Sequence, residues 1–107
     1  MRDDQERLRD ILDAINQIEK YSVQGKDRFM EDELIQTWVI HHLMIIGEAS
    51  RNISQETREK YADIPWVGTI DVRNIITHEY VRIDINIIWM IIEDNLPDFK
   101  KKIETIL

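Results

Sequence analysis

The sequence predicts an all-α protein, built as an antiparallel bundle of four to five helices. Apolar residues recur at spacings of three and four along its long segments, which is the period of a helical stripe. Only three glycines and two prolines interrupt the 107 residues, so the elements should be few and long. Four principal helices that alternate in direction form an antiparallel bundle, and residues 1–107 are enough for one domain only.

The first two helices are predicted from their apolar stripes. The first stripe consists of Leu8, Ile11, Leu12, Ile15 and Ile18. Gly25 is expected to end that helix. The second helix should run from about residue 30 to 53, and its stripe consists of Leu34, Trp38, Leu43, Ile45, Ile46, Ala49 and Ile53. His41 and His42 fall within it, where we expect partly buried packing residues.

The next two helices are predicted from their starting residues. Ser54 can cap a short polar helix that reaches Lys60. The third long helix should begin at Ile64-Pro65-Trp66, because proline suits a first helical turn, and run toward His78. Its residues 75–77 are β-branched, but a strand there would have no partner strand.

Asp84 can cap the last helix, in which Pro97 should cause a kink or a break. Its main apolar face consists of Ile87, Ile88, Ile91, Ile92, Leu96, Phe99, Ile103 and Leu107. Three further apolar residues, Ile85, Trp89 and Met90, lie off that face. They indicate either a dimer interface or a helix buried at the centre of its own bundle.

Composition indicates a cytoplasmic protein without membrane association. Residues 1–13 are charged and lack the apolar core of a signal peptide. No apolar run approaches the roughly 20 residues that cross a bilayer. The chain has no cysteine, so disulfides and thiolate metal sites are excluded.

The segment that could carry chemistry is Arg73-Asn74-Ile75-Ile76-Thr77-His78-Glu79-Tyr80. On a helix, Arg73, Thr77 and Tyr80 share one stripe, and Asn74 and His78 share the adjacent one. Histidine can exchange a proton with a ribose hydroxyl, and arginine can hold and stabilise a phosphate. Asn74 can orient the His78 ring or a substrate oxygen. Such a set permits phosphodiester cleavage with no metal or cofactor.

A second interpretation of the same residues requires no catalysis. Arg73 would pair with Asp71 or Glu79, and His78 would merely end a helix. The net charge of −7 favours this interpretation, because nucleic-acid binders usually carry a basic surface. The protein would then be a helical binding module.

The catalytic interpretation predicts that the active form is a homodimer. Cleavage through the 2′-hydroxyl needs both an acid and a base, whereas one motif supplies a single histidine. Two motifs that face each other across a two-fold axis would supply two histidines and two arginines. This expectation depends only on the residues present.

The chain resembles HepT, the toxin of the HepT–MntA toxin–antitoxin pair, within the HEPN domain superfamily. The family's motif is an arginine, four residues, a histidine, one residue and a tyrosine, here Arg73, His78 and Tyr80. Asn74 follows the arginine. Four further stretches carry the resemblance over almost the whole chain: Arg7-Leu8-Arg9-Asp10-Ile11-Leu12, Ile45-Ile46-Gly47-Glu48-Ala49, Ile64-Pro65-Trp66 and Glu93-Asp94-Asn95-Leu96-Pro97.

The resemblance implies a HEPN-like homodimer whose paired motifs line a cleft that cuts RNA without metal. Arg73 and His78 would be catalytic and Asn74 supporting, on either transfer or messenger RNA. It also implies an MntA-type nucleotidyltransferase antitoxin that attaches AMP to Tyr80. Relatives often have a small residue where this chain has Asp71, an acid that could orient Arg73 or repel RNA. The alternative function is a non-catalytic helical partner of a nucleotidyltransferase.

Overall fold

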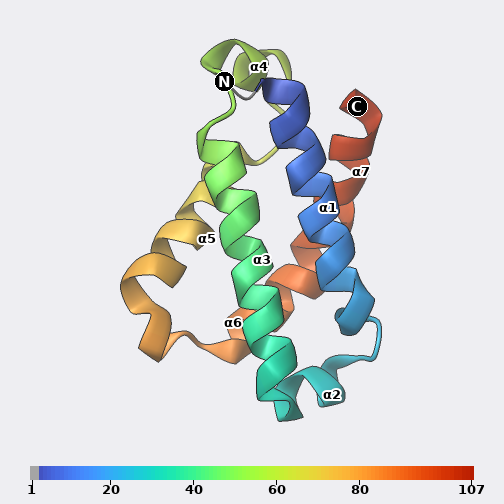
Figure 1. The fold of residues 1–107 in the computed structure, drawn as a ribbon, viewed down its shortest axis with the longest axis vertical. Helices are drawn as coiled ribbons and strands as arrows, with labels where there is room; N and C mark the ends of the chain where they lie inside the picture. Colours follow the sequence, from blue (N-terminus) through green and yellow to red (C-terminus); the bar gives the residue numbers. More distant parts are fainter. Residues whose placement is uncertain (1–2) are drawn as a thin grey trace.

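A computed structural model describes residues 3–107, and all regular structure in that range is helical. The four long units are α1 (Asp4–Ser22), α3 (Glu33–Arg51), α5 (Trp66–Glu79) and a continuous last unit of α6 (Ile85–Met90), the π turn η2 (Ile91–Asn95) and α7 (Leu96–Ile106). The shorter elements are α2 (Lys26–Glu31), α4 (Gln55–Lys60) and the 3₁₀ turn η1 (Tyr80–Arg82). Consecutive long units alternate in direction (Figure 1). The predicted all-α class is confirmed; residues 1 and 2 of the predicted domain lie outside the described range.

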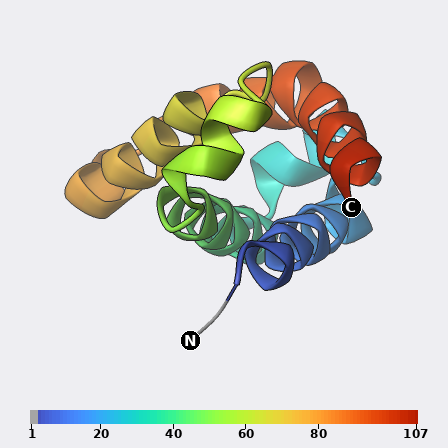
Figure 2. The ribbon, with the colours of Figure 1, turned by 90° about the horizontal axis from the view of Figure 1, so that it is seen from above.

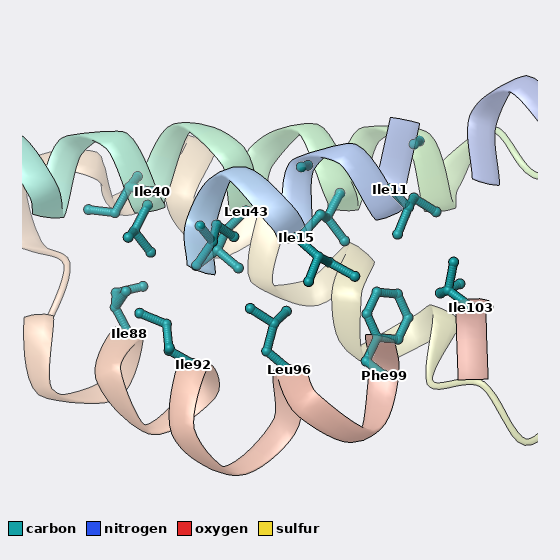
Figure 3. Close-up of a cluster of buried hydrophobic side chains, with 14 of the residues drawn as sticks. Ile11, Ile15, Ile40, Leu43, Ile88, Ile92, Leu96, Phe99 and Ile103 are labelled. Carbon is teal, nitrogen blue, oxygen red and sulfur yellow. The ribbon is translucent and has the colours of Figure 1, made fainter. Parts of the chain in front are cut away.

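The core lies where α1 and α3 face the last helical unit. Figure 3 shows its aliphatic and aromatic side chains meeting between these elements, among them Ile11, Ile15, Ile40, Leu43, Ile88, Ile92, Leu96, Phe99 and Ile103. Burial of one such side chain contributes about 1.5–3 kcal/mol, so this cluster is the main source of stability. At its edge Lys100 Nζ donates to Glu19 Oε1 at 2.6 Å, which joins α7 to α1 and raises the pKa of Lys100.

The connection between the first two long helices differs from the prediction. Helix α1 ends at Ser22, before Gly25, which has a φ of 97° and precedes the unpredicted short helix α2. Helix α3 begins at Glu33 rather than near residue 30, because the Asp32 carboxylate accepts the N–H groups of Leu34 and Ile35. Leu34 therefore lies in the first turn of α3 and is 82% exposed, although its spacing placed it on the buried stripe.

Pro97 does not break the last helical unit. Asp84 caps α6 as predicted, since its Oδ1 accepts the N–H of Asn86 at 2.9 Å. Immediately before the proline the helix widens into η2, where the N–H of Leu96 bonds to the carbonyl of Ile91, five residues back. A π turn of this kind keeps the helix continuous ahead of a residue that lacks an N–H donor.

The π turn also changes which face of the last unit is buried. The buried positions Ile88, Ile92 and Leu96 are each four residues apart, a longer spacing than the 3.6-residue α-helical period. Ile87, predicted on the main face, lies in α6 ahead of the π turn and is 55% exposed. Trp89, predicted off that face, is buried and donates its indole N–H to Glu93. For Trp89, central burial is therefore the correct interpretation, while Met90 is exposed.

Helix α5 packs closely on α3 but diverges from α7 (Figure 2). The close approach requires Gly47, because a Cβ built there would lie 2.2 Å from Arg73 Cβ and 2.8 Å from the Thr69 carbonyl oxygen. The divergence leaves a pocket of about 340 Å³ between α5 and α7, with Leu43 and Ile46 of α3 among its lining residues.

Helix α4 is fastened to the start of α1 by one carboxylate. Asp4 accepts hydrogen bonds from the Ser54 N–H at 3.0 Å and from the hydroxyls of Ser54 and Thr57, each at 2.6 Å. Ser54 caps α4 as predicted. These bonds hold the pKa of Asp4 below its ordinary value of 3.8. No helix among residues 3–107 is both long and apolar enough to span a bilayer.

Asp4→Ala should lower the free energy of unfolding at pH 7, because it removes the hydrogen bonds that join α4 to α1. The loss should be only about 1 kcal/mol, since the carboxylate is partly exposed. Because the folded-state pKa is lowered, the stabilisation is present above the unfolded value of 3.8 and is lost as the pH falls through the folded value. Urea titrations at pH 7 and pH 2.5 measure this difference. Asp13→Asn, at an exposed position of α1, is the control, and an equal loss for both variants at pH 7 would contradict the assignment.

Gly47→Ala should destabilise the protein by about 1–3 kcal/mol, because the added methyl group displaces α5 from α3. Gly68→Ala is the matched control: its added Cβ would meet only Pro65 Cβ, at 3.8 Å, and alanine is the better helix former by about 1 kcal/mol. Thermal unfolding of both variants compares them directly. Equal melting temperatures would show that the Gly47 contact is not tight in solution.

Candidate active site

The predicted third helix is confirmed as α5, and two buried residues hold it in place. Trp66 opens the helix after Pro65 and donates its indole N–H to the Tyr61 carbonyl at 3.1 Å. Ile76, midway between Arg73 and His78, is 1% exposed and faces the core. The β-branched residues remain helical, and the Thr77 hydroxyl bonds to the Arg73 carbonyl at 2.9 Å. The rotation of α5 is therefore fixed, with Arg73 facing α3 and His78 exposed.

The structure brings Arg73 and Asn74 into contact and leaves His78 and Tyr80 exposed. The Asn74 side-chain oxygen accepts from Arg73 Nη1 at 3.0 Å, so its observed partner is the guanidinium rather than the His78 ring. His78 is exposed near the end of α5, and within residues 3–107 neither it nor Tyr80 has a side-chain hydrogen bond. The α-helix ends at Glu79, so Tyr80 begins η1 rather than extending the stripe of Arg73 and Thr77.

Arg73 pairs with Glu48 of α3, and not with Asp71 or Glu79 as the second interpretation expects. Arg73 Nε lies 3.1 Å from Glu48 Oε2. With Nη1 bonded to Asn74, the two N–H groups of Nη2 have no hydrogen-bond partner among the described residues. The guanidinium is thus held on two sides and open on the third. Its side chain is 22% exposed.

Glu48 is itself held by neighbours at the C-terminal end of α3. The Asn52 amide donates to the Glu48 carbonyl at 2.8 Å and to Oε1 at 3.4 Å. Arg51 Nη1 lies 3.9 Å from Oε2. One carboxylate therefore faces two guanidinium groups. Sequence reasoning missed Glu48 because the pairing joins two helices; the adjacent Gly47, which marks a close helix contact, was the available signal.

The two other histidines have different environments. His42 is 8% exposed, its Nδ1 lies 2.7 Å from the Trp38 carbonyl oxygen, and its ring centroid is 4.5 Å from that of Trp38. His42 is a packing residue, as predicted. His41 is exposed and makes an edge contact with the His42 ring, so the prediction of partial burial is wrong for His41.

Exposed apolar residues surround the end of α5 that carries His78. We call Ile75, Val81, Ile87 and Met90 the motif-end patch; their exposed fractions range from 55% to 94%. Ile75 and Ile87 also line a groove of about 210 Å³ between α5 and α6, together with Glu79 and Arg82. The site thus combines an open guanidinium edge and a free imidazole with an uncovered apolar surface. It can contact an anionic oxygen, exchange a proton and pack against another surface.

Comparisons with known proteins agree on one family. The family model described as "Ribonuclease HepT-like" matches residues 11–106. A Methanocaldococcus jannaschii protein named "Putative RNase MJ1380" is 36% identical over 92% of each chain. A Thermococcus cleftensis protein named "Probable ribonuclease HepT" is 34% identical over 91% of this chain and 89% of its own. No solved structure gives a significant match. The chain belongs to the HepT-like family of the HEPN superfamily.

Proposed function

We propose that this protein is a metal-independent endoribonuclease toxin in which Arg73 and His78 are catalytic and Asn74 supports Arg73. The observation that carries the proposal is the Arg73 guanidinium, which is held at Nε and Nη1 and open at Nη2, on the same helix as an exposed histidine. The names of its relatives as ribonucleases support RNA as the substrate. Transfer RNA and messenger RNA both fit, because the site has no element that reads base edges.

The chemistry follows from the two groups. A neutral His78 accepts the proton of a ribose 2′-hydroxyl, and the oxygen attacks the adjacent phosphorus. The bond from phosphorus to the 5′-oxygen breaks, and a second, protonated histidine gives that oxygen its proton. The products are a 2′,3′-cyclic phosphate and a 5′-hydroxyl. Arg73 stabilises the negative charge that builds on the phosphate oxygens in the transition state.

The second histidine is supplied by a second copy of the chain. A two-fold axis beside the motif would place two copies of Arg73 and His78 around one phosphate. The motif-end patch supports this placement, because its apolar side chains are exposed next to the motif and would be covered in such a dimer. The active form is thus a homodimer in which α5, η1 and α6 form the interface.

The antitoxin would be an MntA-type nucleotidyltransferase that transfers AMP from ATP to the Tyr80 hydroxyl, with release of pyrophosphate. Tyr80 is 58% exposed, so its hydroxyl is accessible to another enzyme. The added phosphate would compete with RNA for Arg73, and the nucleotide would occupy the cleft. The modified toxin would then be inactive.

Purified protein should cut RNA in the presence of EDTA, and Arg73→Ala and His78→Ala should each lower the rate by at least about a hundredfold, because each removes a catalytic group. Arg9→Ala and His41→Ala remove an exposed arginine and an exposed histidine on other helices and should leave the rate unchanged. Gel assays with a labelled RNA measure it. If no form of the protein cuts RNA, the non-catalytic binding module becomes the better account.

Val81→Asp should dissociate the dimer and abolish cleavage, because it places a charge within the motif-end patch. Val67→Asp is the matched control, since Val67 is 69% exposed at the other end of the motif helix and Val81 is 94% exposed in η1. Light scattering coupled to size-exclusion chromatography gives the mass. A wild-type monomer that is fully active would refute the shared site.

Co-expression with a neighbouring nucleotidyltransferase should increase the intact mass by one or more AMP units and suppress cleavage. Peptide mapping should place the addition on Tyr80. Tyr80→Phe should block the addition, since it removes the hydroxyl acceptor, and so restore cleavage. An unchanged wild-type mass with full inhibition would indicate that the antitoxin acts by contact alone.

A further inference from the structure

We infer that Glu48 is a positioning residue that holds the guanidinium of Arg73 in the orientation that stabilises the phosphate of the transition state. The inference rests on the proposed nuclease function for its catalytic consequence, but the contact itself can be tested without it. Glu48 lies on α3, outside the motif, and its carboxylate reaches Arg73 across the helix contact at Gly47. Its role is therefore exerted through Arg73 and not on the substrate.

The need for such a residue follows from the length of the arginine side chain. A free arginine side chain loses considerable rotamer freedom when it is fixed. In this protein the Arg73 side chain is already fixed before substrate binds, because Glu48 Oε2 lies 3.1 Å from Nε and Asn74 accepts a hydrogen bond from Nη1 at 3.0 Å. These two contacts fix the plane of the guanidinium. Nη2, on the free edge, is left for an anionic oxygen.

The charges around Glu48 also favour positioning over neutralisation. Its Oε2 lies 3.1 Å from Arg73 Nε and 3.9 Å from Arg51 Nη1. Two cations therefore share one anion, and the group as a whole keeps a positive charge that can attract phosphate. If Glu48 instead competed with phosphate for Arg73, removing it would strengthen RNA binding. The two roles thus predict different results: positioning predicts a lower kcat, whereas competition predicts tighter RNA binding.

The first measurement observes the contact directly, in protein without RNA. In a ¹⁵N-labelled sample, the Nε–H of Arg73 should exchange slowly with water because the Glu48 carboxylate lies against it, with Oε2 3.1 Å from Nε. Glu48→Ala should accelerate that exchange by at least about tenfold. Arg51→Gln is the matched control: it removes the other cation at the same carboxylate and should leave the Arg73 signal protected. Equal exchange in wild type and Glu48→Ala would overturn the inference.

The second measurement separates positioning from binding or folding. Glu48→Ala should lower kcat by roughly 10- to 100-fold, the size of effect typical when a residue that orients a functional group is lost. The KM for RNA should be nearly unchanged. Glu48→Gln keeps an acceptor oxygen and should recover part of kcat. A raised KM with normal kcat, tighter RNA binding, or a loss that follows a lowered melting temperature would each overturn the positioning role.

The two experiments also distinguish this inference from the function on which it rests. If wild-type protein cuts no RNA but Glu48→Ala releases the Arg73 Nε–H, the contact is supported and the nuclease function fails. If wild-type protein cuts RNA and Glu48→Ala leaves both exchange and kcat unchanged, the nuclease function stands and the role of Glu48 is refuted.

Discussion

The contact between α3 and α5 at Gly47 determines where the candidate site residues of α5 lie. Because Gly47 has no side chain, the backbone of α3 can approach Arg73 Cβ and the Thr69 carbonyl more closely than a Cβ would allow. That approach brings the Glu48 carboxylate within reach of Arg73 Nε. It also fixes the rotation of α5, so that Ile76 is buried and His78 is exposed. The absence of a side chain at Gly47 thus allows both the close packing of α3 on α5 and the ion pair between Glu48 and Arg73.

The acidic composition has a structural explanation that bears on function. Several carboxylates in the described part of the chain act as helix caps: Asp3, Asp32 and Asp84 each accept a backbone N–H at the start of a long helix or helical unit. Asp4 accepts hydrogen bonds from α4. These acids are used within the fold, and net charge alone is therefore a poor guide to what the α5 surface can bind. Around Glu48, the local balance favours positive charge.

Much of the fold could be predicted because its signals are local. The four long helices, the caps at Ser54 and Asp84, and the placement of the motif on a helix follow from spacing within a few turns. Helix α2, the exposure of Leu34 and the π turn before Pro97 could not be predicted, since they depend on caps and packing that override the apolar period. In the candidate site, the motif residues were found and Glu48 was missed, because its partner lies on another helix.

The separation of α5 from α7 has a consequence for how the protein can vary. The core shared by α1, α3 and the last helical unit supplies most of the buried apolar surface, whereas the motif helix packs mainly on α3. Substitutions that repack the α1–α7 interior leave the joint between α3 and α5 intact. Most of the apolar core thus lies away from the α3–α5 contact, and a lineage can retune its tolerance to heat there without moving the guanidinium or the imidazole.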